Sequence, residues 1–584
     1  MSLIVHGING PVVKLRPGGA LSMLEIVYVG RQRLVGEVVG IAGDTATVQV
    51  YEDTAGLRPG DEAERGGGPL ELQLGPGLLH NIFDGIARPL RVIESRTGPF
   101  MARGVNIPSL DPERLWDVTL HVTEGDELKS GDIYASCPET ELVTHKCVCP
   151  FAGRVTRAAQ SGKYGVNSVV CALTDAKGRE HELTLCGRWP IRRPRPVLRR
   201  LPIDRPLLTG QRIIDSLFPI AKGGCAAVPG PFGAGKTITQ HQLAKWSDAD
   251  IVVYLGCGER GNEMTQVLEE FGALLDPRSG KPLLDRTVLI ANTSNMPVAA
   301  REASVYTGMT IAEYYRDMGY HVALMADSTS RWAEAMREIS GRLEEMPAEE
   351  GYPAYLSSRL AEFYERAGYT VTLGGNEGSV TVIGAVSPQG GDFSEPVTQN
   401  TKRFIRTFWA LDRQLAYARH FPSINWITSY SEYLDDLAPW YEEHLGRDFA
   451  HLRSRVTNLL IEESKLMEIV KLIGADILPE DQKLIIEAAR VVRLGFLQQN
   501  AYHATDTFVP IEKQKRMMEL MLRLYDGALT LVERGIPLSQ LKETGIFDEL
   551  IRMKYDIPND SLHLLDGTGE NIDKALRAVT EANE

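Results

Sequence analysis

The sequence predicts a multidomain protein with an α/β domain at its centre, and three observations support this prediction. A glycine-rich stretch, GPFGAGKT at 230–237, lies between a short apolar run and a helical pattern, which is the setting of a phosphate-binding P-loop. Apolar runs alternate with helical patterns through residues 207–435, as they do in a parallel sheet covered by helices. The sequence before this region has the pattern of short strands, and the sequence after it is helical.

Size and composition limit the possible classes of protein. A chain of 584 residues is too long for one hydrophobic core, so we expect three or four domains. The net charge of −14 argues against a nucleic-acid groove as the main surface. No run of 18 apolar residues occurs, and the start of the chain lacks a charged leader. We therefore expect a cytoplasmic protein that does not span a membrane and, with seven unevenly spread cysteines, no secreted disulfide framework.

The N-terminal part is predicted to contain two β domains. Residues 1–72 read as short strands with turn signals, including a hairpin turn at Gly43 and Asp44, and predict a β-barrel. Residues 113–188 are again rich in β signals with Gly-Asp and Gly-Lys turns, and predict an inserted β module. A proline-rich joint at 189–206 closes this module.

Residues 73–112 and 189–435 are predicted to form the P-loop domain, of RecA-like α/β architecture. Its buried strands are expected at 225–228, 251–258, 287–294, 321–327 and 379–387. Ligands of such sheets bind beyond the carboxyl ends of the strands. Residues 436–584 are predicted to form an α-helical bundle, with one helix starting at a cap on Asp481. Its apolar stripes are Leu452, Val456, Leu459, Leu460 and Leu466, then Leu484, Ala488, Val491 and Val492.

The glycine loop is the first candidate binding site. Its glycines let successive backbone N–H groups turn toward phosphate oxygens at the positive end of the following helix. Lys236 supplies a mobile positive charge for the outer phosphates, and Thr237 supplies a hydroxyl for Mg²⁺. The expected ligand is therefore a nucleotide with Mg²⁺. The candidate nucleotide-binding residues here are Gly230, Pro231, Phe232, Gly233, Ala234, Gly235, Lys236 and Thr237.

Two further strand ends carry candidate catalytic groups. Asp327 ends an apolar run and can hold the Mg²⁺ coordination shell, although it also suits a helix N-cap. Glu259 can polarise the attacking water, and Arg260 can stabilise charge on the transferring phosphoryl group. The alternative is that Glu259 and Arg260 form an ordinary first turn of a helix, where acidic residues are common.

A second cluster, His145, Cys147 and Cys149, has the residue types of a metal site. Alternate spacing on a strand also places side chains on one face without any ligand. Both interpretations stay open from the sequence alone.

Five motifs together closely resemble the catalytic A subunit of the vacuolar and archaeal-type (V/A-type) rotary ATPases. They are GPFGAGKT, GCGERGNEM, ALMADSTSRWAEA, EEMPAEEGYP and PSINWITSYS, and the resemblance covers essentially the whole chain. It implies that the cofactor is Mg²⁺ with ATP or ADP, and that Lys236 and Thr237 bind phosphate and Mg²⁺. It also implies that Glu259 activates water, that Arg260 contacts the γ-phosphate and that Asp327 completes the metal site. It also implies that Phe421 and Tyr502 sandwich adenine, for which the alternative is plain core packing.

One departure from the family is Ala234, which stands where eukaryotic relatives carry a loop cysteine. Disulfide control is therefore not expected, and a prokaryotic source is favoured. Nothing in the sequence indicates that the thiol of Cys257 is activated.

The resemblance also implies partners. They are a non-catalytic B-type subunit in an alternating hexamer, central and peripheral stalk subunits, and a membrane sector that moves H⁺ or Na⁺, with no nucleic acid. The chain would lie at the cytoplasmic face of the membrane. Two other functions stay open from the sequence: a regulatory protein that binds nucleotide without hydrolysing it, and a homohexameric translocase ATPase.

Overall fold

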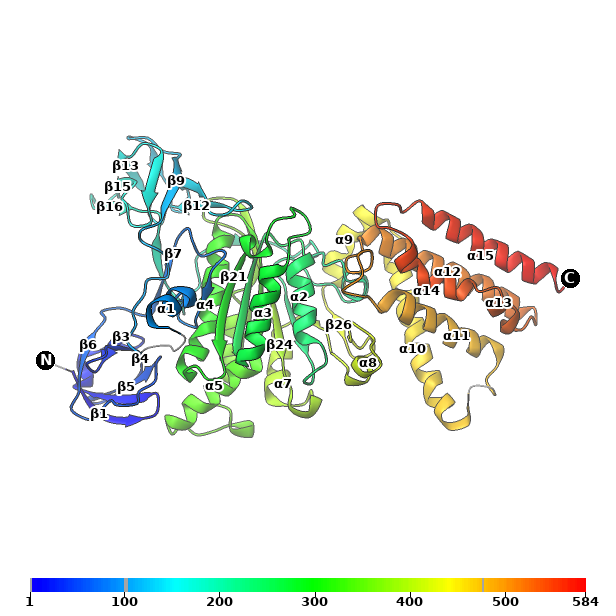
Figure 1. Cartoon of the computed structure of the whole chain (residues 1–584), viewed down its shortest axis with the longest axis horizontal. Coiled ribbons are helices and arrows are strands. Elements are labelled where there is room, and N and C mark those ends of the chain that lie inside the picture. Colours follow the sequence, from blue (N-terminus) through cyan, green and yellow to red (C-terminus); the bar gives the residue numbers. More distant parts are fainter. Residues whose placement is uncertain (1–2, 99–102, 475–476) are drawn as a thin grey trace. The chain divides into compact units, whose positions relative to one another are not determined.

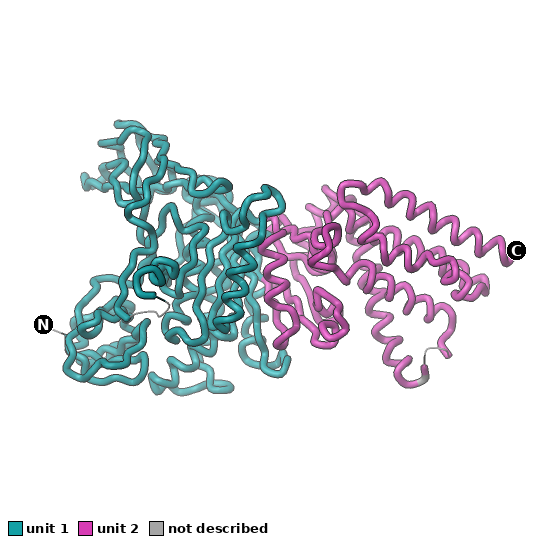
Figure 2. Tube along the Cα trace, in the orientation of Figure 1, with its two compact units in different colours: residues 1–202, 222–225, 249–405 teal, residues 203–221, 226–248, 406–584 magenta. Residues whose placement is uncertain are grey.

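The computed structural model describes residues 3–98, 103–474 and 477–584 (Figure 1). The first two residues of the predicted barrel, four residues of the predicted P-loop domain and two of the helical domain lie outside the described residues. The chain divides into two compact units (Figure 2). Unit 1 comprises residues 1–202, 222–225 and 249–405, and unit 2 comprises residues 203–221, 226–248 and 406–584. Each unit is described by itself.

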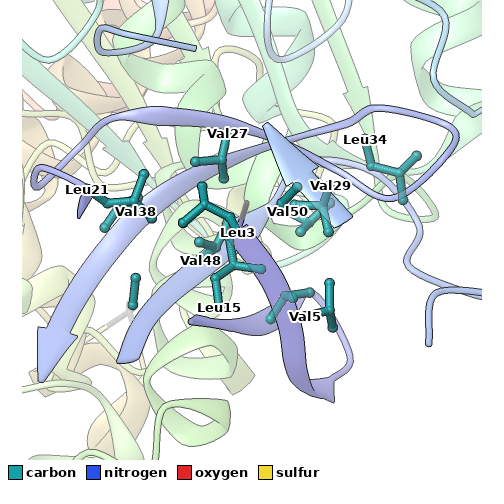
Figure 3. Close-up of a cluster of buried hydrophobic side chains, with 13 residues drawn as sticks. Leu3, Val5, Leu15, Leu21, Val27, Val29, Leu34, Val38, Val48 and Val50 are labelled. Carbon is teal, nitrogen blue, oxygen red and sulfur yellow. The ribbon is translucent and has the colours of Figure 1, made fainter. Parts of the chain in front are cut away.

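The N-terminal domain of unit 1 is the predicted β-barrel. Its strands close in the order β1-β2-β5-β4-β3-β6. Alternate apolar side chains from these strands fill the barrel, and those labelled in Figure 3 are buried. The predicted hairpin at Gly43 and Asp44 joins β4 to β5, with Gly43 at φ +56°. The strands are β1 Leu3–Asn9, β2 Val12–Arg16, β3 Ile26–Val29, β4 Leu34–Ala42, β5 Thr45–Val50 and β6 Glu62–Arg65.

The inserted module is also β-structured, as predicted. It consists of two antiparallel sheets with the orders β10-β13-β15-β16 and β12-β11-β9-β14. The chain enters and leaves it along one antiparallel pair, β7 (Glu71–Leu74) and β17 (Gly187–Pro190). The strands of the module are β9 Leu115–Leu120, β10 Glu127–Leu128, β11 Ile133–Pro138, β12 Thr144–Val148, β13 Gly153–Ala158, β14 Gly162–Gly165, β15 Cys171–Thr174 and β16 Glu180–Leu183.

The rest of unit 1 is a parallel sheet accompanied by helices. Its strands are continuous apolar runs, and such strands are stable only where both faces of the sheet are covered. The strands are hydrogen-bonded in the order β24-β22-β20-β21-β8, all parallel. They are β8 Ile82–Phe83, β20 Ile251–Glu259, β21 Thr287–Thr293, β22 His321–Asp327 and β24 Glu377–Val386, with the edge strands β18 Arg199–Arg200 and β23 Gly368–Val371. The helices are α1 Leu90–Thr97, α3 Gly261–Ala273, α4 Val298–Asp317, α5 Thr329–Arg342, α6 Leu356–Tyr364 and α7 Pro396–Lys402.

Unit 2 contains the glycine loop and the helical region. The strand β19 (Cys225–Pro229), of which residues 226–229 belong to this unit, pairs in parallel with β25 (Thr407–Phe408). It leads into α2 (Lys236–Trp246), and β26 (Tyr430–Ser431) pairs with β25. The helices that follow are α8 Arg413–Tyr417, α9 Leu434–Leu445, α10 Phe449–Ile473, α11 Glu480–Val491, α12 Ile511–Glu533, α13 Leu538–Glu543, α14 Ile546–Asp556 and α15 Leu564–Glu581.

The predicted apolar stripes of α10 and α11 are largely buried in the helical region, as expected for a bundle. The predicted cap at Asp481 is wrong. Pro479 is the N-cap residue of α11 and Asp481 lies inside the first turn. Proline pre-sets the backbone for a helix start, and the carboxylate of Asp481 acts there through the helix dipole.

Candidate active site

The glycine loop has the backbone that a phosphate cradle needs. Gly233 and Gly235 have φ angles of +78° and +91°, a region that favours glycine. A Cβ atom on Gly230 would lie 2.7 Å from the Cβ of Leu411, so a side chain there would overlap a packed neighbour. The hydroxyl of Ser423 donates a hydrogen bond of 2.5 Å to the carbonyl oxygen of Ala234 and so holds the backbone of the loop in place. The loop therefore delivers backbone N–H groups to the positive end of α2.

The two polar side chains of the P-loop motif lie in the first turn of α2. The Nζ of Lys236 donates hydrogen bonds to the carbonyl oxygens of Gly230 and Pro231, at 2.7 and 3.1 Å. Lys236 and Thr237 are both half-buried, whereas Phe232 at the tip of the loop is 76 % exposed. The ammonium group of Lys236 is thus held over the loop that is expected to hold the phosphates.

The two predicted adenine-binding residues, both in unit 2, have different surroundings. Phe421 packs against the loop, because a Cβ on Gly235 would lie 3.4 Å from its ring. It lines a small cavity with Gly235, Gln499 and Ala501. Tyr502 is 88 % exposed and does not line this cavity.

In unit 1 the two predicted carboxylates lie at the carboxyl ends of two neighbouring strands of the parallel sheet. Asp327 is the last residue of β22 and pairs in register with Gly256 of β20, and Glu259 ends β20 three positions further on. Asp327 is 4 % exposed, and the Tyr254 hydroxyl donates to its Oδ2 at 3.3 Å. Glu259 is half-buried.

The pKa of Glu259 is raised to about 8. Burial is the largest cause, followed by the negative charge of Asp327 and by a hydrogen bond with Glu263 and that group's charge, while Arg331 opposes the shift. Such perturbed carboxyl groups at a strand end are typical of catalytic sites.

The structure starts a helix shortly after each of these positions, as the alternative interpretations expected. Glu259 belongs to β20 and not to a helix turn, Arg260 is the exposed N-cap residue of α3, and the acidic residue in the first turn is Glu263. The N-cap residue of α5 is Ser328, whose side chain makes no capping hydrogen bond, and Asp327 is the residue before it.

Three residues near Glu259 were not singled out from the sequence. Glu263 lies four positions after Glu259, a spacing that could have signalled an interacting pair. Gly258 has a φ of +71°, and a Cβ there would lie 2.7 Å from the Cβ of Arg331 and 3.0 Å from the Cδ of Arg301. Only the fold reveals Arg331, which belongs to α5 and whose charge acts on Glu259.

A hydroxyl and a carboxylate form an oxygen-only donor set, and Mg²⁺ prefers such ligands. Thr237 and Asp327 thus suit the implied metal chemically. Thr237 belongs to unit 2 and Asp327 belongs to unit 1, and the position of each is described within its own unit.

The cluster around His145 is not a metal site in the described part of the chain, where no group of three or more His, Cys, Asp or Glu could hold an ion. The buried imidazole of His145 has a partner at each nitrogen, with Nδ1 2.9 Å from Glu139 and Nε2 2.9 Å from the Tyr314 hydroxyl. Glu139 also accepts hydrogen bonds from the Tyr315 hydroxyl and from the N–H groups of Gly77 and Leu79. His145 is therefore part of a buried network that joins the inserted module to α4.

The thiol of Cys257 is buried and lies 3.6 Å from the Ser304 hydroxyl. Burial raises its pKa to about 12, so the reactive thiolate is not formed near neutral pH.

The fold and the loop define a class of protein with a nucleotide-binding domain of the ATP synthase alpha/beta family, which residues 210–431 match. Residues 5–67 match the beta-barrel domain of this family, and residues 107–192 match its barrel-sandwich domain. Residues 438–542 match the C-terminal domain of V and A type ATP synthase.

The chain belongs to the V- and A-type branch of this family, among the alpha chains, also called A subunits. It is 59 % identical over 558 residues to the V-type ATP synthase alpha chain of Halothermothrix orenii, covering 95 % of each chain. It is 56 % identical over 557 residues to the A subunit of the A-type ATP synthase of Methanopyrus kandleri, covering 95 % of this chain and 94 % of the relative. The solved structure of the ATPase EscN, from the type III secretion system of enteropathogenic E. coli, shares the fold with a TM-score of 0.63. The two sequences are 21 % identical, and the match covers 89 % of this chain and 100 % of that chain.

Proposed function

We propose that this chain is the catalytic subunit of a rotary ATPase or ATP synthase, and that it hydrolyses or makes ATP. The observation that carries the proposal is the pair of carboxyl groups, Glu259 and Asp327, at one edge of the parallel sheet in a chain that also has an intact P-loop. A regulatory protein that only holds nucleotide needs no carboxylate for polarising water.

Each residue has a proposed role in the reaction. The loop N–H groups and Lys236 bind and orient the phosphates, and Phe421 and Tyr502 hold the adenine. Glu259, when ionised, accepts a hydrogen bond from the attacking water and aligns it. Arg260 stabilises negative charge on the transferring phosphoryl group. Mg²⁺, held by Thr237 and Asp327, would supply charge neutralisation for the phosphates when bound.

The partners and location are proposals of the same kind. The relatives are named as chains of ATP synthases, which supports a multisubunit, membrane-associated complex. We infer a non-catalytic B-type subunit in an alternating hexamer, central and peripheral stalks and a membrane sector that moves H⁺ or Na⁺. No helix in the described part of the chain is long and apolar enough to cross a membrane.

The competing function is a homohexameric translocase ATPase. The likeness to EscN supports a common fold alone, whereas identities of 56–59 % along nearly the whole chain favour the ATP synthase chain. Purification from native membranes distinguishes the two, because the proposal requires a distinct second ring protein to copurify. A ring built of this chain alone would support the translocase.

Substitutions in the reconstituted complex test the chemistry. Lys236→Ala and Glu259→Gln are expected to leave assembly intact and to lower single-turnover ATP hydrolysis by two or more orders of magnitude, on the order expected for groups that stabilise transition-state charge. Lys245→Ala, in the last turn of the same helix as Lys236, is the control and should retain turnover. Near wild-type turnover by Glu259→Gln would remove the proposed water-aligning group.

A further inference from the structure

Unit 1 contains a cavity of about 470 Å³ that belongs neither to the P-loop nor to the carboxylate edge. It lies where the inserted β module packs against the end of α4. Apolar and aromatic side chains supply much of its lining, including Tyr134, Leu183, Leu185, Trp189 and Tyr314. Sites for small organic ligands are typically clefts of about 300–1,000 Å³ with such a lining.

The wall of this cavity is fixed by hydrogen bonds within the protein. The Tyr134 hydroxyl donates to the carbonyl oxygen of Thr184, and the Tyr314 hydroxyl is paired with His145, which is itself bound to Glu139. Because these buried hydroxyls already have partners, the wall does not require a polar ligand to satisfy it. The side chains of this wall are therefore held in place, and the lining favours apolar groups.

The charged residues around the cavity are unequally paired. Asp317 is bound to the Nε of Arg195 at 2.6 Å, and Glu182 is bound to Arg157 at 3.3 Å. Arg188, in contrast, has no carboxylate oxygen within 4.0 Å among the described residues, and it is exposed. Both acidic side chains thus have an ion-pair partner, whereas Arg188 has none among the described residues.

Trp189 supplies an aromatic part of the cavity wall. The guanidinium carbon of Arg195 lies 4.8 Å from the centre of the Trp189 ring, and that of Arg193 lies 5.5 Å from it. A cation over an aromatic ring holds the ring in place. An indole ring beside Arg188 can pack against an aromatic ligand while the guanidinium group pairs with an anionic substituent.

We propose that this cavity is a binding site for a small aromatic anion, a planar fused- or two-ring molecule that carries a carboxylate or sulfonate. Its rings occupy the space between Tyr134, Leu183 and Tyr314, and its negative group pairs with Arg188. The site lies on the inserted module and α4, so its occupation is independent of the chemistry proposed for the nucleotide.

Two matched fluorescent probes test the proposal on the full chain with saturating Mg²⁺ and ADP present. The probes are 8-anilinonaphthalene-1-sulfonate, which is anionic, and N-phenyl-1-naphthylamine, which has the same ring system without the charge. Arg188→Ala is expected to weaken binding of the anionic probe about three- to tenfold, as for one partly exposed charge-assisted contact, and to leave the neutral probe unchanged. Arg199→Ala removes an exposed arginine that does not line the cavity, and should change neither probe.

Leu183→Trp places a larger side chain in the cavity and should abolish binding of both probes, with folding checked by thermal unfolding. If this variant does not fold, the comparison of the two probes on Arg188→Ala decides by itself. Equal binding of the anionic probe by wild type and Arg188→Ala, or no saturable binding of either probe by the wild type, would overturn the proposal.

Discussion

Glu259 and Asp327 end two hydrogen-bonded parallel strands of one sheet, and the negative charge of Asp327 helps to raise the pKa of Glu259 to about 8. Glu259 therefore holds its proton more tightly than an ordinary glutamate does. A group that must align water at neutral pH benefits from a pKa close to the working pH.

The first prediction concerns pH. Glu259 should act only when ionised, so hydrolysis by the reconstituted complex is expected to rise as the pH approaches about 8. Glu263→Gln removes one cause of the raised pKa, and the rise should then occur at lower pH. The pH dependence of kcat measures both. An unshifted profile in Glu263→Gln would show that Glu263 does not act on Glu259.

The same shift makes a prediction about stability. The pKa of Glu259 in the folded state lies above its ordinary value of 4.5, so the folded protein binds more protons than the unfolded chain between pH 4.5 and about 8. Stability due to this group therefore falls as pH rises through that window. Glu259→Gln should unfold at a higher temperature than the wild type above pH 8, and at a similar temperature near pH 5. A pH-independent difference in thermal unfolding would contradict this.

The second position to test is Gly258, which needs φ +71° and has no room for a Cβ beside Arg331. Gly258→Ala is expected to destabilise unit 1 by about 2–4 kcal/mol, from the left-handed backbone and the overlap together, and to displace the adjacent Glu259. Gly261→Ala is the control, because no described atom lies within 4 Å of a Cβ there. Chemical denaturation and turnover report both effects; equal results for the two variants would refute the argument.

Phe421 should contribute to nucleotide affinity. Removing a base-stacking ring costs about 1–3 kcal/mol, so Phe421→Ala is expected to weaken ADP binding about 5- to 150-fold. Tyr417→Ala removes a ring that is 72 % exposed and serves as the control. Isothermal titration calorimetry measures the difference. Unchanged affinity would assign Phe421 to packing alone.

A buried ion pair in unit 2 should matter more than an exposed one. Arg212 and Asp506 are both fully buried, with Nη1 and Oδ1 2.5 Å apart. Asp506→Asn leaves the guanidinium group without its counter-charge, and should lower the free energy of unfolding by about 3–5 kcal/mol. Asp526→Asn breaks the exposed pair with Arg455 and should cost less than about 1 kcal/mol. Urea denaturation compares them; a small loss in Asp506→Asn would mean that other groups compensate.

Much of the fold could be predicted because it depends on local sequence patterns, that is, on the order of residues close together in the chain. Continuous apolar runs predicted strands β20, β21, β22 and β24 within about two residues, and the glycine motif predicted the start of α2. The start of α11 was missed because proline and acidic residues both favour a helix N-terminus, and the side-chain cap that Asp481 suggested was not used.

The site was less predictable because its finer features are non-local. Arg331 opposes the raised pKa of Glu259 from 72 positions away in the chain, and the partners of His145 come from Glu139 and Tyr314. No local spacing distinguishes such a paired histidine from a metal ligand. The functional roles of the site residues stay predictions, namely those of Lys236, Thr237, Glu259, Arg260, Asp327, Phe421 and Tyr502.

The carboxylate of Glu139 has a consequence for protein engineering. It is 5 % exposed and accepts hydrogen bonds from two backbone amides, from Tyr315 and from His145. Burial raises its pKa, but His145 and the amides of Leu79 and Gly77 outweigh burial, so the pKa lies below its ordinary value. Glu139 thus belongs to the inserted module, but most of its hydrogen-bond donors, Gly77, Leu79 and Tyr315, belong to the domain that carries the module. A module exchanged with that of a distant relative would fold onto its new host only if the recipient offered equivalent donors, so a viable chimera must transfer Glu139, His145, Tyr314 and Tyr315 together.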